Sequence, residues 1–185
     1  MAINLAKGQK ISLDKEAGKA VTKVTMGLGW DTGRVQVDLD ASCALFADDN
    51  SLIETVFFGT PGKKNANGSV IHSGDNLTGA GDGDDEQIKV DLSKVDARVK
   101  NIVFTVNSYR GQKFTVVENA FVRIVNQDDG KELCRFNLSE KYSTTGLIMA
   151  RLYRHNGEWK FATIGEGADG QTVNDMISKI KPLLG

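Results

Sequence analysis

One stretch of the chain decides the fold class: Leu152-Tyr153-Arg154-His155-Asn156-Gly157-Glu158-Trp159-Lys160-Phe161. An Asn-Gly pair stands between two runs of strand-like composition, residues 146–155 and 158–164. Asn and Gly tolerate the positive φ angles that a two-residue hairpin turn requires. The stretch therefore predicts an antiparallel β-hairpin.

The same strand pattern extends outward over most of the chain. Gly, Asn and Asp turn signals separate short runs with strand-like composition. Besides the two runs of the hairpin, these predicted strands span residues 10–13, 23–28, 35–46, 53–58, 70–72, 87–92, 101–106, 120–126 and 132–137. Strands without alternating helices favour an all-β fold, an antiparallel β-sandwich, with a β-barrel as the alternative.

A single short helix is predicted at the C-terminus. Its apolar residues recur at helical spacing: Val173, Met176, Ile177 and Ile180. Thr172 and Asp175 are placed to cap its N-terminus, and Pro182 follows its end.

Length and composition indicate one globular domain over residues 1–185, with 40% hydrophobic and 25% charged residues. We expect a cytoplasmic protein, because no signal peptide and no run long enough to span a membrane is present. The net charge of −1 and the absence of a basic block argue against nucleic acid as a partner. Cys43 and Cys134 are predicted to be buried thiols, not disulfide partners or zinc ligands.

The most acidic run of the chain is Gly74-Asp75-Asn76-Leu77-Thr78-Gly79-Ala80-Gly81-Asp82-Gly83-Asp84-Asp85-Glu86. Carboxylates this close repel one another unless a cation or solvent neutralises them, and glycines let the backbone curve around an ion. Calcium suits such a run, because it takes 6–8 oxygen ligands in a flexible arrangement. The spacing does not fit an EF-hand, and zinc would need His or Cys. A solvated acidic loop is the alternative interpretation.

A second group of acids lies on the predicted strand of residues 35–46. Strand alternation puts Asp38 and Asp40 on one face, about 7 Å apart, where both could border one metal site. Two acids on a solvent-facing surface are the alternative. Asp31 follows Gly27-Leu28-Gly29-Trp30, which we interpret as a turn, and it is either a third ligand or a turn residue.

Catalytic motifs are not evident, and we expect no enzyme. The run Asp38-Leu39-Asp40-Ala41-Ser42 approximates the start of Mg²⁺-dependent phosphatases with an aspartyl nucleophile, but those enzymes need a parallel α/β sheet. His72 and His155 lie in strand or turn contexts and are interpreted as structural. No catalytic or organic-cofactor residues are predicted.

Four blocks of the chain resemble the TerD-like tellurite-resistance and bacterial stress proteins. They are Val24-Thr25-Met26-Gly27-Leu28-Gly29-Trp30-Asp31, Val37-Asp38-Leu39-Asp40-Ala41-Ser42, the acidic run of residues 74–86, and residues 152–161. The resemblance implies a calcium-binding β-sandwich of the bacterial cytoplasm without established catalysis. It also implies a role in tellurite resistance and in responses to phage, colicins or general stress.

Carried over to this sequence, the resemblance implies a metal shell, enough for two Ca²⁺ ions, made of Asp31, Asp38, Asp40, Asp75, Asn76, Asp82, Asp84, Asp85 and Glu86. It also implies a Ca²⁺-dependent scaffold for protein partners, other tellurite-resistance proteins at the inner membrane among them. Two alternatives stay open. Calcium could bridge the loops to anionic lipid in a peripheral membrane sensor, or it could only stabilise the fold.

Overall fold

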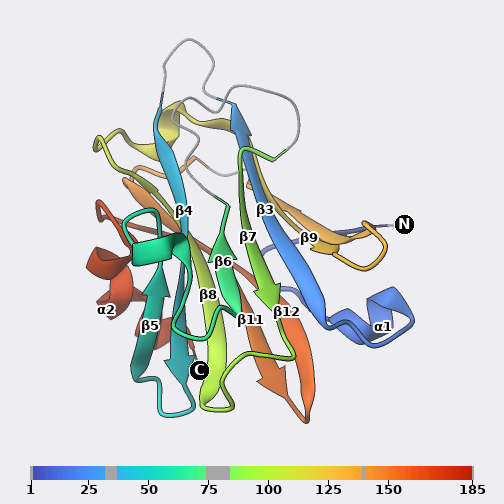
Figure 1. The fold of residues 1–185 in the computed structure, drawn as a ribbon. Helices are drawn as coiled ribbons and strands as arrows, with labels where there is room; N and C mark the ends of the chain where they lie inside the picture. Colours follow the sequence, from blue (N-terminus) through green and yellow to red (C-terminus); the bar gives the residue numbers. More distant parts are fainter. Residues whose placement is uncertain (1, 32–36, 74–83, 139–140, 185) are drawn as a thin grey trace.

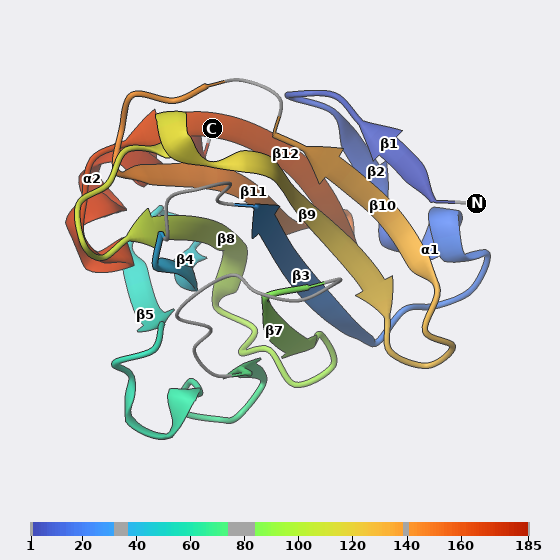
Figure 2. The same ribbon diagram turned by 90° about the horizontal axis from the view of Figure 1, so that it is seen from above.

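Strands dominate the computed structural model of the chain, which describes residues 2–31, 37–73, 84–138 and 141–184. The strands form two sheets packed face to face, and a helical segment near the C-terminus covers the outer face of one of them (Figure 1). The view along the strands shows the same layers (Figure 2).

The elements have the following bounds in chain order. The strands are β1 (Ile3–Leu5), β2 (Lys10–Ser12), β3 (Lys23–Asp31), β4 (Leu39–Ala47), β5 (Leu52–Val56), β6 (Val70–His72), β7 (Glu86–Asp91), β8 (Val99–Ser108), β9 (Glu118–Asn126), β10 (Glu132–Asn137), β11 (Gly146–His155) and β12 (Glu158–Ala168). The helical elements are α1 (Leu13–Ala17), η1 (Pro61–Lys63), η2 (Phe114–Val116), η3 (Val173–Met176), α2 (Ile177–Ile180) and η4 (Lys181–Leu183).

The predicted sandwich is confirmed, and the barrel alternative is not adopted. Sheet A has the strand order β1-β10-β9-β3-β7-β6, and sheet B has the order β2-β12-β11-β8-β4-β5. The pairs are antiparallel except that β1 runs parallel to β10. Because each sheet ends in short strands, little backbone is left unpaired at the edges.

The hairpin predicted at Asn156-Gly157 is present. His155 pairs with Glu158, and the two turn residues Asn156 and Gly157 have φ angles of 51° and 76°. Positive φ at both central positions is the property of a type I′ turn, whose twist matches that of the strands. The hairpin supplies β11 and β12 to sheet B, where β11 lies between β12 and β8.

The core follows from strand alternation, most clearly in β4. One set of β4 side chains enters the core between the sheets: Leu39, Ala41, Cys43 and Leu45. The alternate residues Ala44 and Phe46 face outward and pack under the C-terminal helical segment. The strand begins at Leu39 and not at residue 35; residues 35–36 lie outside the described residues.

The C-terminal helix is present, but as short turns of η3, α2 and η4 and not as one continuous α-helix. The Asp175 carboxylate accepts the N–H of Thr172 at 3.1 Å, so the predicted cap residues do meet. Pro182 has no N–H with which to continue α-helical hydrogen bonding, and it lies in the first turn of η4.

Four short elements were not predicted from the sequence: β1, α1, η1 and η2. The predicted strand of residues 10–13 ends at Ser12, whose side chain caps the five-residue helix α1. Gly18 ends that helix with a φ of 68°, a left-handed conformation that glycine adopts without strain. β1 is only three residues long and carries one buried side chain, Leu5, so it has no periodicity to detect.

Cys43 and Cys134 are free thiols in the core, as predicted, and burial raises the pKa of each to about 12. A thiol needs both exposure and ionisation to react. We therefore expect the native protein not to react with Ellman's reagent in mildly alkaline buffer. The same protein in guanidinium chloride should release colour for two thiols, and rapid labelling of the native state would contradict this burial.

Candidate metal centre

The described acids of the predicted site gather at one end of the sandwich. Antiparallel pairing sets Leu28 of β3 opposite Glu86, the first residue of β7, and β3 continues to Asp31. The start of β4 lies at the same end (Figure 1; Figure 2). This end holds six of the predicted ligands: Asp31, Asp38, Asp40, Asp84, Asp85 and Glu86. Asp75, Asn76 and Asp82 lie outside the described residues.

Glu86 joins the two sheets from a fully buried position. Its Oε2 accepts the N–H of Ala41, on β4 of the other sheet, at 2.6 Å. The Nε2 of His72 lies 2.8 Å from the Ala41 carbonyl oxygen and 3.5 Å from Glu86 Oε2. Ala41 is paired with Val106 of β8 on one side, but β5 pairs with β4 only from Cys43 onward. These two side chains therefore provide hydrogen-bond partners for the Ala41 backbone on the side that β5 does not reach.

Asp84 forms a buried ion pair with Arg123 of β9. The guanidinium Nε donates to Oδ1 at 2.8 Å and Nη2 donates to Oδ2 at 2.9 Å, while Gln87 donates a third hydrogen bond. Hydrogen bonding to Asp84 raises the pKa of Arg123. The carboxylate lies over Gly27, where a Cβ would come within 2.4 Å of it.

Asp85 and Asp31 are more accessible and repel each other. Asp85 accepts the backbone N–H of Trp30 at 2.8 Å, and its own N–H donates to the carbonyl of Leu28. Burial raises the pKa of Asp85, the hydrogen bond from the Trp30 N–H lowers it in part, and the charges of Asp31 and Asp84 raise it by smaller amounts. Asp31 is exposed and accepts a hydrogen bond from Asn119 at 3.0 Å.

Asp40 lies in β4 of sheet B and Asp38 directly precedes that strand; they are 4% and 9% exposed, so they do not form the solvent-facing surface that was the alternative. Asp40 alternates with Leu39 and Ala41, whose side chains enter the core, and it therefore lies on the outer face, across from Asn107. The Oδ2 of Asp38 lies 3.9 Å from Arg110 Nε.

The described residues supply only part of a metal shell. Within residues 2–31, 37–73, 84–138 and 141–184, no three acidic, histidine or cysteine side chains come close enough together to hold an ion. The donors present are nonetheless all oxygen atoms, the type that Ca²⁺ prefers. Asp84 pairs with Arg123, and Glu86 accepts the Ala41 N–H. The charges of Asp31 and Asp84 repel that of Asp85, and a bound cation would reduce this repulsion.

Residues 27–30 are not the turn that sequence analysis expected; they lie within β3. The glycine at position 27 makes room for the carboxylate of Asp84, so the strand can continue beside a buried ion pair. A glycine inside a strand often marks the close approach of another group, so Gly27 is a sequence signal for this contact. No sequence pattern indicated that Arg123 takes part in the site, because its partner Asp84 is 39 residues away in the chain.

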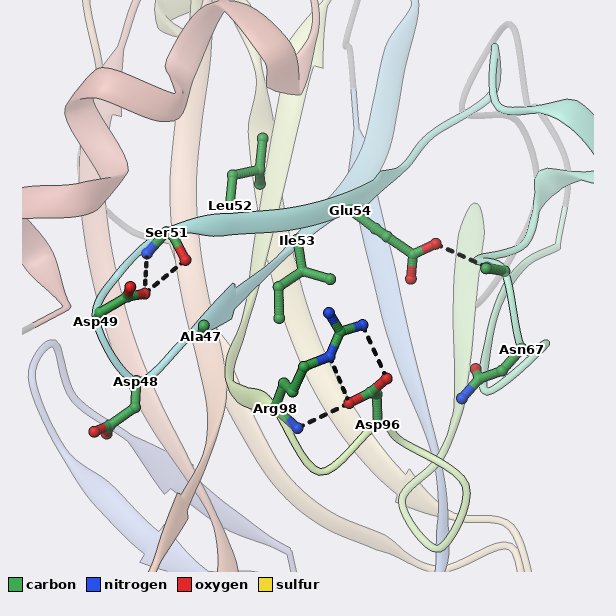
Figure 3. Close-up of a pocket in the computed structure, with 11 residues that line it drawn as sticks. Ala47, Asp48, Asp49, Ser51, Leu52, Ile53, Glu54, Asn67, Asp96 and Arg98 are labelled. Carbon is green, nitrogen blue, oxygen red and sulfur yellow. Dashed lines mark hydrogen bonds and ion pairs between the residues drawn. The ribbon is translucent and has the colours of Figure 1, made fainter.

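A groove of about 760 Å³ lies near the opposite end of the sandwich, beside β5 (Figure 3). Three of its four acidic side chains contact neighbours in the groove or at its rim. Asp49 accepts from Ser51, Glu54 accepts the N–H of Ala66, and Asp96 pairs with Arg98. None of its 11 lining residues is a histidine or a cysteine, so we do not assign chemistry to it.

Replacing Glu86 tests the link between the sheets. Glu86→Ala leaves the Ala41 N–H without an acceptor in the core, and we expect a loss of about 2–4 kcal/mol in the free energy of unfolding. Glu86→Gln retains a carbonyl oxygen of the same reach and should lose less than half as much. Urea denaturation measures both, and equal losses would contradict a hydrogen bond to this oxygen.

Replacing Arg123 tests the buried ion pair. Arg123→Met leaves the Asp84 carboxylate buried without its cation, and we expect a loss of about 3 kcal/mol or more in the free energy of unfolding. Arg135 stacks on Phe121 and contacts Glu132 on the same sheet, so Arg135→Met is the matched control. A control loss as large as that of Arg123→Met would show that the pairing with Asp84 is not what matters.

In the described part of the chain, no helix has the length and apolar character needed to cross a membrane.

Comparison with known proteins places the chain in a family. The TerD domain profile matches residues 1–179. Tellurium resistance protein TerZ of Serratia marcescens is 45% identical and aligns over 96% of both chains. General stress protein 16U of Bacillus subtilis is 47% identical over 92% of this chain and 93% of its own.

Solved structures agree on the fold. The crystal structure of a homologue of telluride resistance protein (TerD) from Streptomyces coelicolor A3(2) has a TM-score of 0.72 and 20% identity. It covers 88% of this chain and 98% of its own. With a domain match over nearly its whole length and two relatives above 40% identity, the chain belongs to the TerD domain family.

Proposed function

We propose that this protein is a calcium-binding stress-response protein with a role in tellurite resistance, and that it acts in the cytoplasm as a Ca²⁺-dependent interaction module. One observation carries the calcium proposal: carboxylates from both sheets gather at a single end of the sandwich. Asp31 and Asp85 come from sheet A and the loop that leads into it, Asp40 comes from the start of β4 in sheet B, and Asp38 directly precedes that strand.

The biological role rests on relatives. The similar proteins are named for tellurium resistance in Serratia marcescens and for general stress in Bacillus subtilis. These relatives span more than nine tenths of the chain, so they include both the sandwich and its acidic end.

The electrostatics of the acidic end favour a divalent cation. Without a cation, burial and the nearby charges of Asp31 and Asp84 disfavour the ionised form of Asp85. Because its pKa is raised in the folded state, its contribution to stability falls as the pH rises through that pKa. Bound Ca²⁺ would offset this loss, since it favours the ionised form of each ligand.

We propose two roles for the nine predicted ligands. Asp84 and Glu86 are held by Arg123 and Ala41, and we assign them the positioning of the segment that carries Asp85. The proposed ligands are then Asp31, Asp38, Asp40, Asp75, Asn76, Asp82 and Asp85, completed by main-chain carbonyls. Seven side chains still provide enough oxygen donors for two ions.

A non-catalytic role is favoured by the surroundings of the acids. The one described histidine near them, His72, is buried against the Ala41 carbonyl and is not exposed to a substrate. Asp38 precedes a strand of an antiparallel sheet, unlike the nucleophile of the Mg²⁺-dependent phosphatases. We therefore assign the calcium end to binding, with a protein partner recognised once the ions order it.

Calcium titration by calorimetry tests the proposal. After treatment with EGTA and dialysis, the wild-type protein should bind Ca²⁺ more tightly than Mg²⁺, and Ca²⁺ should raise the melting temperature. At a free Ca²⁺ concentration of 100 times Kd, binding adds about 2.7 kcal/mol to the free energy of unfolding. The double variant Asp31→Asn, Asp85→Asn should lose most of the binding.

Asp48→Asn is the matched control, because Asp48 is an exposed acid at the other end of the sandwich. It should bind Ca²⁺ as the wild type does. Circular dichroism checks that each variant is folded. Unchanged binding in the double variant, or no heat from the wild type, would overturn the calcium proposal.

A further inference from the structure

A second cavity, of about 520 Å³, lies on sheet B at the end opposite the acidic residues. Strands β2, β8, β11 and β12 contribute to its lining, and Leu184 closes one side. We call it the basic cavity, because its lining includes Lys10, Lys100, Arg151, His155 and Lys160. Its volume falls in the range of small-molecule sites.

The charge of the basic cavity is strongly unbalanced. Arg154 is also in the lining, although its guanidinium points to the backbone carbonyls of Val95, Asp96 and Val99. Asp48 is the single acidic residue among the lining residues. A cavity walled by one sign of charge concentrates the opposite sign, so the ligand should be an anion.

Arg151 is the fixed element of the cavity. Its Nη1 donates to the Asn101 side-chain oxygen at 2.8 Å and to the Leu184 carbonyl at 3.1 Å. Its guanidinium also stacks on the ring of Tyr153, 4.5 Å from the centroid. These partners hold the side chain in place and are neutral.

No carboxylate among the described residues pairs with Arg151, although the side chain is half-buried. Burial without a compensating charge lowers the pKa of this guanidinium. Removing a charge from water is unfavourable unless an opposite charge accompanies it. A bound anion would supply the missing charge, and the remaining N–H groups of the guanidinium are suited to phosphate.

Two lysines extend the positive wall. The pairing of Lys160 with Ser12 and of Ala162 with Lys10 puts Lys10 and Lys160 two residues apart on neighbouring strands, on the same face. Like charges this close on a sheet repel each other. No ion pair to either lysine is found among the described residues.

We propose that the basic cavity binds a small molecule carrying two or three phosphate groups. Arg151 contacts one phosphate group from a fixed position, and Lys10, Lys100 and Lys160 adjust to the others. This many cations exceeds what a single phosphate requires. The proposal does not depend on calcium, because the basic cavity and the acidic residues lie at opposite ends of the strands.

Calorimetry with inorganic tripolyphosphate tests the proposal, at physiological ionic strength and with EGTA present. The wild-type protein should bind tripolyphosphate more tightly than inorganic phosphate. Arg151→Gln should weaken binding by about tenfold or more, the equivalent of 1.4 kcal/mol. The double variant Lys10→Gln, Lys160→Gln should weaken it similarly, and Asp48→Asn should strengthen it.

The double variant Lys89→Gln, Lys94→Gln is the matched control, since both lysines are exposed outside the cavity and the change in net charge is the same. If Arg151→Gln does not fold, the double variant Lys10→Gln, Lys160→Gln still tests the proposal. It should fold, because neither lysine forms an ion pair with a described residue. Absent binding in the wild type, or an equal loss in the control, would overturn the proposal. So would Arg151-dependent binding to anionic phospholipid vesicles without binding of tripolyphosphate.

Discussion

The hydrogen bond from the Ala41 N–H to the buried carboxylate of Glu86 connects the two sheets at the end where the acidic residues meet. It fixes the first residue of β7 against β4, and the preceding residues Asp84 and Asp85 are positioned as a result. Asp84 then reaches Arg123 inside sheet A, while Asp85 stays at the rim beside Asp31. A carboxylate in the core is costly unless it is hydrogen-bonded, so the backbone of β4 and the position of β7 depend on each other.

The sandwich holds a group of acids at one end and a cavity with a basic lining at the other, although the net charge of the chain is only −1. Antiparallel strands bring the end of β3 and the starts of β4 and β7 to one end, and they bring the turn between β11 and β12 to the other. The first end carries Asp31, Asp38, Asp40 and Asp85, and the second carries the basic cavity beside the groove whose lining holds four acids. The proposed calcium site and the proposed phosphate site therefore lie at different ends of one small fold.

Sequence patterns predicted the fold well where they were local and periodic. The Asn156-Gly157 turn and the inward alternation of β4 needed only neighbouring residues to be recognised. Prediction failed where contacts between distant residues determine the structure. A turn was predicted at residues 27–30, but β3 continues through them, and the Asp84 carboxylate occupies the space above Gly27. Among the predicted ligands, the acidic character of the loop was visible, but the use of Asp84 and Glu86 in protein contacts was not.

The sequence by itself determined that this chain forms strands, where its main hairpin turns, that its C-terminal end is helical, and that acids are concentrated around residues 74–86. These properties depend on backbone preferences and on the alternation of side chains, which act over a few residues. Only the tertiary structure decided that Asp84 pairs with Arg123 and that Glu86 accepts the Ala41 N–H. It alone also decided which lysines and arginines line the basic cavity. Those pairings join residues far apart in the chain, and their energies depend on burial, which no local pattern specifies.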